Sequence, residues 1–147
     1  MFFTGSYGVS IDDKGRLAVP APFRQLLSRS DALPLYVLPV THNVAEPHLE
    51  VYPAPKFMDL VRQIDENPNR RDAEMLKRVV VGRSVMMDLD AQGRVVLPQK
   101  LRDDVRINGR AVVMGQSARF EIWDEELLNA RPVDIDALSA AFDSLHR

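Results

Sequence analysis

The sequence predicts an α+β fold in which two copies of one β-rich unit share a core and helices lie at the periphery. Two observations lead to this prediction: a segment that is repeated along the chain, and apolar stripes of helical period that fall between and after the two copies. The chain has 147 residues and is 46% hydrophobic, which is enough to bury a common core.

The repeat has a register of 78 residues, the separation of Asp12 from Asp90 and of Arg16 from Arg94. The first copy reads IDDKGRLAVPAPFR from residue 11, and the second reads LDAQGRVVLPQKLR from residue 89. The Asp, the Gly, the first Arg, the first Pro and the closing Arg are identical, where chance would give about one identity. The two halves therefore share an ancestral segment.

Each copy has the pattern of a β-hairpin followed by a short helix. Strands are expected at 7–11 and 16–19 in the first copy and at 85–89 and 94–97 in the second. Gly15 and Gly93 stand in the turns, where glycine tolerates a positive φ. Proline then ends each second strand, and helical turns are expected at 22–27 and 99–104.

A second pair of strands completes each half. These are expected at 35–38 and 111–114, followed by two segments that echo one another, Leu49-Glu50-Val51-Tyr52 and Phe120-Glu121-Ile122-Trp123. Each half is then a hairpin, a short helix and a further hairpin. Because so few short strands cannot enclose a core alone, the halves are expected to pack as a pseudo-twofold unit, in which interleaving is plausible.

Helices are expected outside the repeated units. Phe57, Leu60, Val61 and Ile64 have the i, i+3, i+4, i+7 spacing of an amphipathic helix. A second helix is expected over about 70–78, before a strand that starts at Val81, and two more at 124–130 and 136–145. The predicted organisation is a first half at 6–53, a helical connector at 54–80, a second half at 83–126 and a C-terminal helical segment at 127–147.

Composition limits the classes of function. The chain has no cysteine, which excludes disulfides, thiolate metal sites and cysteine nucleophiles. It shows neither a secretory leader nor an apolar run near the roughly 18 residues of a membrane span, so a cytoplasmic location without membrane association is expected. The net charge of −2 means that any DNA binding must come from a local basic patch.

The two Asp-x-x-x-Arg turns are the candidate site. One interpretation is structural: Asp12 and Asp90 accept hydrogen bonds from turn amides, and Arg16 and Arg94 pair with them. The duplication favours a second interpretation, in which both turns present donors to double-stranded DNA, since guanidinium groups bind guanine bidentately or anchor phosphates. The predicted DNA-binding residues are Arg16, Arg94, Lys14 and Gln92, with Arg24, Lys100 and Arg102 as weaker candidates. Asp12, Gly15, Asp90 and Gly93 are the predicted turn and orientation residues.

Other kinds of site are not indicated. Residues 88–93 resemble the start of an EF-hand calcium loop, but the twelfth loop position is Gln99 and not a glutamate. The histidines are His42, His48 and His146, and none has a partner at metal-ligand spacing, so surface or loop roles are expected. No hydrolase, P-loop or dinucleotide motif is present, so we expect no enzyme activity, metal, cofactor or small-molecule substrate.

The motifs together resemble those of the MraZ family, over essentially the whole chain. The resemblance rests on the two Asp-x-x-x-Arg copies, on Met1-Phe2 with Gly5, on Glu50-Val51-Tyr52-Pro53, and on Gly115-Gln116 leading to 120–124. The opening segment is one residue longer than the usual Met-Phe-x-Gly. The resemblance implies a double AbrB-like, swapped-hairpin β-barrel and ring-shaped homo-oligomers. It further implies a nucleoid-associated transcription regulator that binds short direct repeats in the promoter of its own division and cell-wall gene cluster through Arg16 and Arg94.

The alternative is an AbrB-like protein-interaction module of the antitoxin type, with DNA binding as a secondary property. Such a module would carry a disordered tail that folds on its partner. The regular apolar stripe at 138–145 argues against a disordered tail, and together with the stripe at 57–64 it favours self-association.

Overall fold

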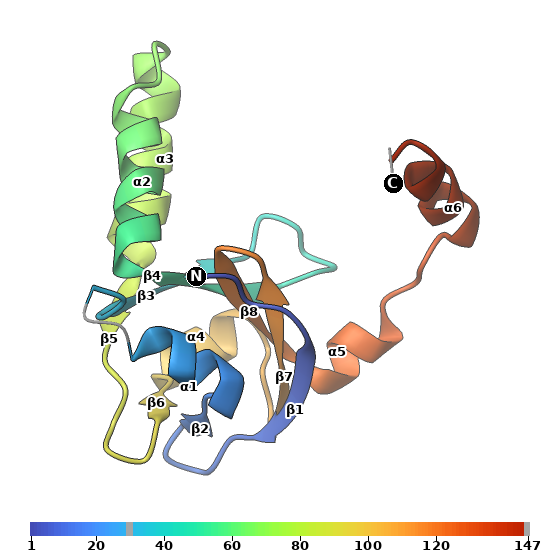
Figure 1. Cartoon of the computed structure of the whole chain (residues 1–147). Helices are drawn as coiled ribbons and strands as arrows, with labels where there is room; N and C mark the ends of the chain where they lie inside the picture. The colour runs from blue at the N-terminus through green and yellow to red at the C-terminus, as the bar shows by residue number, and fades with distance from the viewer. Residues whose placement is uncertain (29–30, 146–147) are drawn as a thin grey trace.

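The computed structural model describes residues 1–28 and 31–145, and it is a mixed α+β structure (Figure 1). The strands are β1 (Ser6–Ser10), β2 (Arg16–Ala18), β3 (Leu35–Val40), β4 (His48–Pro53), β5 (Val85–Met87), β6 (Arg94–Val96), β7 (Arg110–Gln116) and β8 (Arg119–Asp124). The helices are α1 (Ala21–Leu27), α2 (Ala54–Asp65), α3 (Arg70–Arg83), α4 (Gln99–Asp104), α5 (Glu125–Ala130) and α6 (Ile135–Asp143).

The strands of the two halves are interleaved. Among the described residues, the larger sheet has the antiparallel order β1-β7-β8-β4-β3-β5, and β2 pairs with β6 in a separate ribbon. The repeat makes β5 the counterpart of β1, β7 that of β3, and β8 that of β4. Exchanging the strands in these pairs gives the same order, read from the opposite edge of the sheet. The halves are therefore related by a pseudo-twofold axis, which passes between β4 and β8, where Glu50 lies opposite Glu121.

This pairing corrects two expectations. The segments around the turns were expected to pair as local hairpins, but β1 pairs with β7 and β5 pairs with β3. An isolated bridge from Ile11, just after β1, to Leu17 is what the structure retains of the first expected hairpin. A closed barrel was also expected, and the sheet does not close, because β1 and β5 remain its edges. Strands of three residues form few hydrogen bonds, so β2 and β6 depend on each other and on burial of Leu17 and Val95.

The main core lies between the larger sheet, the β2–β6 ribbon and the short helices α1 and α4. Its centre is a triangle of rings, Phe3, Phe23 and Phe120, with centroids 5.1 to 5.2 Å apart. Leu27 and Leu97 are fully buried beside them. Residues from both halves thus build one core, and edge-to-face packing of the rings adds to its apolar burial.

The antiparallel pair α2 and α3 projects from the sheet (Figure 1). The amphipathic pattern of α2 is confirmed, because Phe57 and Ile64 are buried in a second core cluster against Leu38 and Tyr52. The strand expected from Val81 is wrong at its start, since α3 continues to Arg83 and β5 begins at Val85. The apolar run Val79-Val80-Val81 is compatible with a helix and with a strand, so the sequence pattern does not fix where the helix ends.

The C-terminal helix α6 stands away from the rest of the chain (Figure 1). Leu138 and Phe142 of its stripe are exposed, as is Leu145, which lies just beyond the end of the helix. Along the described part of the chain, no helix combines the length and the apolar character that a bilayer crossing requires.

Candidate nucleic-acid interface

The first loop is organised by the Asp12 carboxylate. It accepts hydrogen bonds from the backbone N–H groups of Lys14, at 3.0 Å, and Arg16, at 2.9 Å. The Nε of Arg16 donates to its other oxygen at 2.6 Å. The hydrogen bond from the Arg16 backbone is the main reason that the pKa of Asp12 is lowered, so the carboxylate is held ionised.

The second loop repeats this arrangement. Asp90 accepts from the backbone N–H groups of Gln92 and Arg94, both at 2.9 Å, and from the Nε of Arg94 at 2.9 Å. The Arg94 backbone hydrogen bond is again the main cause of the lowered pKa of Asp90. The side-chain oxygen of Gln92 also accepts from Nη2 of Arg94, at 3.1 Å, a bond that Lys14 cannot supply in the first loop.

Each loop is held against the opposite half. Gly15 has φ +83° and Gly93 has φ +75°, a region that side chains disfavour. A Cβ at Gly15 would lie 2.3 Å from the backbone oxygen of Leu97, which belongs to the other half. The Leu97 N–H donates to the oxygen of Gly15 at 2.8 Å, and the Val19 N–H donates to that of Gly93 at 3.1 Å.

The weaker DNA-binding candidates fall into two groups. Arg24 and Arg102 are half-buried and cross between the halves: Arg102 lies against Gly15 and donates from Nε to the oxygen of Leu97 at 3.0 Å, while Arg24 lies against Gly93. Lys100 is exposed and pairs with Asp104 at 3.2 Å. Lys14 is exposed, and its ammonium group has no partner within the described residues. The two arginines therefore brace the loops, whereas the lysines extend into solvent.

Arg16 and Arg94 share one face of the β2–β6 ribbon. The register places Arg16 opposite Val96 and Arg94 opposite Ala18, and these four alternate with the buried Leu17 and Val95. The arginine side chains are 35% and 31% exposed. Over the part of the chain that the structure describes, the Nη atoms of Arg16 have no hydrogen-bonding partner. Pairing with Asp12 thus uses Nε alone and leaves both terminal nitrogens able to donate.

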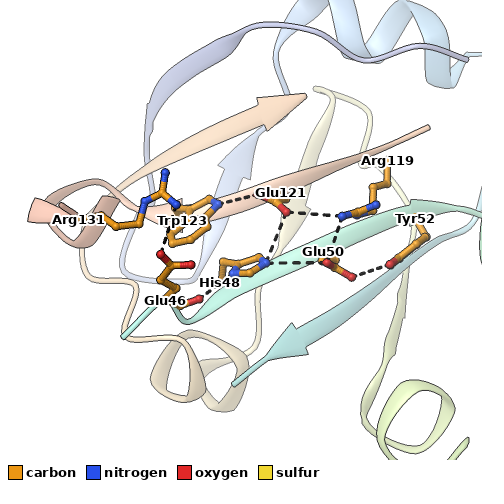
Figure 2. A network of polar contacts seen from close by, with 8 residues as sticks. All are labelled: Glu46, His48, Glu50, Tyr52, Arg119, Glu121, Trp123 and Arg131. Carbon is orange, nitrogen blue, oxygen red and sulfur yellow. Dashed lines mark hydrogen bonds and ion pairs between the residues drawn. The ribbon is translucent and has the colours of Figure 1, made fainter. Parts of the chain in front are cut away.

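A second polar cluster, which the sequence did not indicate, lies between β4 and β8 (Figure 2). The Nδ1 of His48 is 2.8 Å from the Glu46 carbonyl oxygen, and its Nε2 is 3.5 Å from Glu121 and 3.9 Å from Glu50. The imidazole stacks on the Trp123 ring at 4.4 Å. The surface or loop role expected for His48 is therefore wrong, since its side chain is only 13% exposed. His42 is exposed as expected, and His146 lies outside the described residues.

Arg119 is the counterpart of His48 in the repeated strand. Its Nη2 lies 3.4 Å from Glu50 and 3.9 Å from Glu121, and its guanidinium faces the Tyr52 ring. Tyr52 donates to Glu50, and Trp123 donates to Glu121, so each glutamate has the same i+2 aromatic donor (Figure 2). Two carboxylates thus face two basic groups at the axis between the halves.

The charge of this cluster decides what it can do. His48, Glu50 and Glu121 place ligand atoms within 4.8 Å of one another, a spacing that could hold a metal ion. The Arg119 guanidinium already lies 3.4 Å from Glu50 and 3.9 Å from Glu121 and offsets part of their negative charge, which favours an ion-pair cluster instead. Burial lowers the pKa of His48, but contacts with Glu50, the Glu46 carbonyl and Glu121 outweigh it and raise that pKa. The echo of Glu50 and Tyr52 in Glu121 and Trp123 is the sequence signal from which this cluster could have been found.

Comparisons with known proteins agree with the motifs. A family model described as "MraZ protein, putative antitoxin-like" matches residues 2–79 and 81–130. A Pseudomonas aeruginosa protein named Transcriptional regulator MraZ is 36% identical over 130 residues, which cover 87% of this chain and 83% of the relative. Proteins of the same name from Marinobacter nauticus, 35% identical over 87% and 85% of the two chains, and from Hydrogenovibrio crunogenus, 31% identical over 95% and 91%, are also similar. With both Asp-x-x-x-Arg loops and the repeated strands inside the matched residues, the chain belongs to the MraZ family.

Proposed function

We propose that this chain is a sequence-specific DNA-binding transcriptional regulator that acts on short direct repeats in the promoter of its own division and cell-wall gene cluster. The relatives named as transcriptional regulators support the regulatory class. The observation that carries the proposal is the presence of Arg16 and Arg94 on one exposed face, each held by an aspartate of its own turn.

The β2–β6 ribbon suits the major groove of DNA. A two-stranded antiparallel ribbon fits the width of that groove, and a guanidinium with free terminal nitrogens can donate to O6 and N7 of guanine. Each such contact contributes about 1–3 kcal/mol of base discrimination. Because Asp12 and Asp90 hold the Nε atoms, the arginines lose less side-chain entropy on binding.

The other predicted residues have supporting roles in this proposal. Lys14 and Lys100 contact phosphates, and Gln92 keeps the Arg94 side chain extended through their hydrogen bond. Arg24 and Arg102 hold the glycine turns from the opposite half. The crossing of strands between the halves supports assignment to the AbrB-like swapped-hairpin type, in an open rather than a closed form.

We propose that the protein works on the nucleoid, in the cytoplasm, as a ring-shaped homo-oligomer. The net charge of −2 gives a single chain little attraction for DNA, but linked subunits that meet successive repeats can raise avidity by about 10²–10⁴-fold. The exposed apolar side chains of Ile135 and Leu138 on α6, and of Leu145 just beyond it, support contacts with further chains.

The same exposed stripe favours the second candidate, an antitoxin-type interaction module. In that case α6 would hold a different protein, and DNA binding would be secondary. Deletion of residues 132–147 separates the two: a regulator that reads DNA through β2 and β6 loses avidity but still binds the promoter fragment weakly at low salt, whereas an interaction module loses its partner protein.

The test is binding to the promoter fragment upstream of the gene, measured by gel shift across a salt series. Wild type, Arg16→Ala and Arg94→Ala are compared with Arg62→Ala, which removes an exposed arginine from α2 that is paired with Asp59. Oligomeric state is measured in parallel by light scattering. We expect the ribbon variants to remain assembled and to lose the discrete shift, while Arg62→Ala keeps it. If both ribbon variants bind like wild type, the Asp-x-x-x-Arg elements are structural braces only.

A further inference from the structure

The exposed face of the ribbon carries an unexpected apolar side chain. Val96 is 51% exposed, although Val95 beside it is buried in the core. The cross-strand neighbour of Val96 is Arg16, one of the proposed DNA-contacting residues. Single exposed apolar residues are common, so the exposure of Val96 gains meaning only from its position directly opposite Arg16 on the proposed DNA-contacting face.

The major groove offers one apolar feature to such a side chain, the C5-methyl group of thymine. Directly opposed residues in an antiparallel pair have Cβ atoms about 4.5–5.5 Å apart, and stacked base pairs are about 3.4 Å apart. When Arg16 contacts one base pair, Val96 therefore reaches the same base pair or the next one. Because a G·C pair carries no thymine, a methyl group that Val96 contacts beside a guanine-bound Arg16 belongs to the adjacent base pair, and the two side chains together read two neighbouring base pairs.

Comparison of the two halves adds a second observation. Residue 18 corresponds to residue 96 in the repeat register, as Arg16 corresponds to Arg94, and residue 18 is alanine. The exposed face of the ribbon is thus twofold symmetric in its arginines and asymmetric in its apolar positions. A symmetric face would suit a palindrome, whereas the additional methyl groups of Val96 distinguish the two ends of a site.

We propose that Val96 is a specificity-determining residue that packs on a thymine methyl group and gives the β2–β6 ribbon a preferred direction on its site. This inference rests on the proposed DNA binding through Arg16 and Arg94. It adds an apolar base contact, on one side only, to the polar contacts of the two arginines.

The experiment replaces each thymine of the bound promoter site by uracil, which removes only the methyl group. Affinity is measured by fluorescence anisotropy for wild type, Val96→Ala and the control Val81→Ala, which shortens an exposed valine on α3 outside the ribbon. We expect one thymine position at which uracil weakens wild type by about fourfold, the effect of one buried methyl group. Val96→Ala loses this sensitivity at that position, and Val81→Ala keeps it.

The outcomes separate the inference from the proposed function. If wild type forms no discrete complex with the thymine-containing fragment, the proposed function itself fails. If the complex forms but no uracil position weakens it, or if Val96→Ala remains as sensitive as wild type, Val96 does not contact a thymine methyl group. Thermal unfolding of each variant establishes that any loss of sensitivity is measured on folded protein.

Discussion

Glu50 and Glu121 lie directly opposite each other in the β4–β8 pair, at the axis that relates the two halves. Two carboxylates in this position would repel each other if they were alone. His48 and Arg119 supply the positive charge, one from each half, and Arg119 lies 3.4 Å from Glu50. The junction of the halves therefore depends on one permanent cation and one titratable cation.

The pH dependence of stability follows from His48. Its pKa in the folded protein is raised above the ordinary value of 6.5, so its contribution is fully present below that value. The contribution is lost as pH rises from 6.5 through the raised folded pKa. Urea unfolding between about pH 5 and about pH 9 should show the free energy of unfolding fall in this window. His48→Gln should flatten that fall, whereas His42→Gln, at an exposed position, should not.

Removal of one carboxylate from the axis should destabilise the junction. Glu121→Gln leaves Arg119 and His48 with Glu50 alone, at a site where Glu121 is 11% exposed, and we expect a loss of about 1–3 kcal/mol in unfolding free energy. Fluorescence of Trp123, the sole tryptophan, reports the change directly, because its indole N–H donates to Glu121. Asp59→Asn, in an exposed pair on α2, should change stability by less than about 0.5 kcal/mol. Equal effects of the two substitutions would contradict the role of the cluster.

The aspartates of the loops should affect DNA binding more than stability. The substitutions Asp12→Asn and Asp90→Asn each retain a side-chain oxygen that can accept from the turn amides. Each removes the negative charge that holds the Nε of the arginine. The ion pairs are partly exposed, so we expect thermal stability near that of wild type. DNA affinity should fall by less than in the corresponding Arg→Ala variants, as measured by anisotropy. Wild-type affinity in both Asn variants would show that the aspartates do not orient the arginines.

The two turn glycines should differ in their tolerance of alanine. At Gly15 the added Cβ would meet the backbone oxygen of Leu97 at 2.3 Å, which cannot move without displacing β6. At Gly93 the near atom is Cδ of Arg24, a flexible side chain that can shift. Both substitutions place a side chain at positive φ, which lowers the free energy of unfolding by about 1–2 kcal/mol. Gly15→Ala should lower it distinctly further, as measured by urea unfolding.

Gly82→Ala is the matched control for the glycine series. Gly82 lies in α3, and a Cβ there would meet nothing within 4 Å, so helix propensity predicts a gain of about 0.5–1 kcal/mol. A double variant, Gly93→Ala with Arg24→Ala, should recover part of the loss of Gly93→Ala. Similar losses at Gly15 and Gly93, with no recovery in the double variant, would mean that contacts across the halves do not determine the cost.

Local features of this chain could be predicted from sequence because their contacts lie within a few residues. Asp12 and Arg16 are four positions apart, and the hydrogen bonds of the turn require only an Asx acceptor and a glycine at positive φ. The buried stripe of α2 follows in the same way from the spacing of Phe57 and Ile64. The 78-residue repeat also predicted that the two halves would share one core.

Strand partners were decided only by the tertiary structure. Apart from proline, every residue type offers the same backbone donor and acceptor, and the apolar pattern around the turns is compatible both with a local hairpin and with pairing across the halves. In the fold, β2 pairs with β6, and Leu17 and Val95 are both buried in the shared core. The environment of His48 likewise depends on β8, some seventy residues away in the chain, because only the fold brings Glu121 and Trp123 to it. The sequence by itself determined the loops, the helices and the repeat, whose causes are local, while long-range packing determined the sheet order and the ionic cluster at its axis.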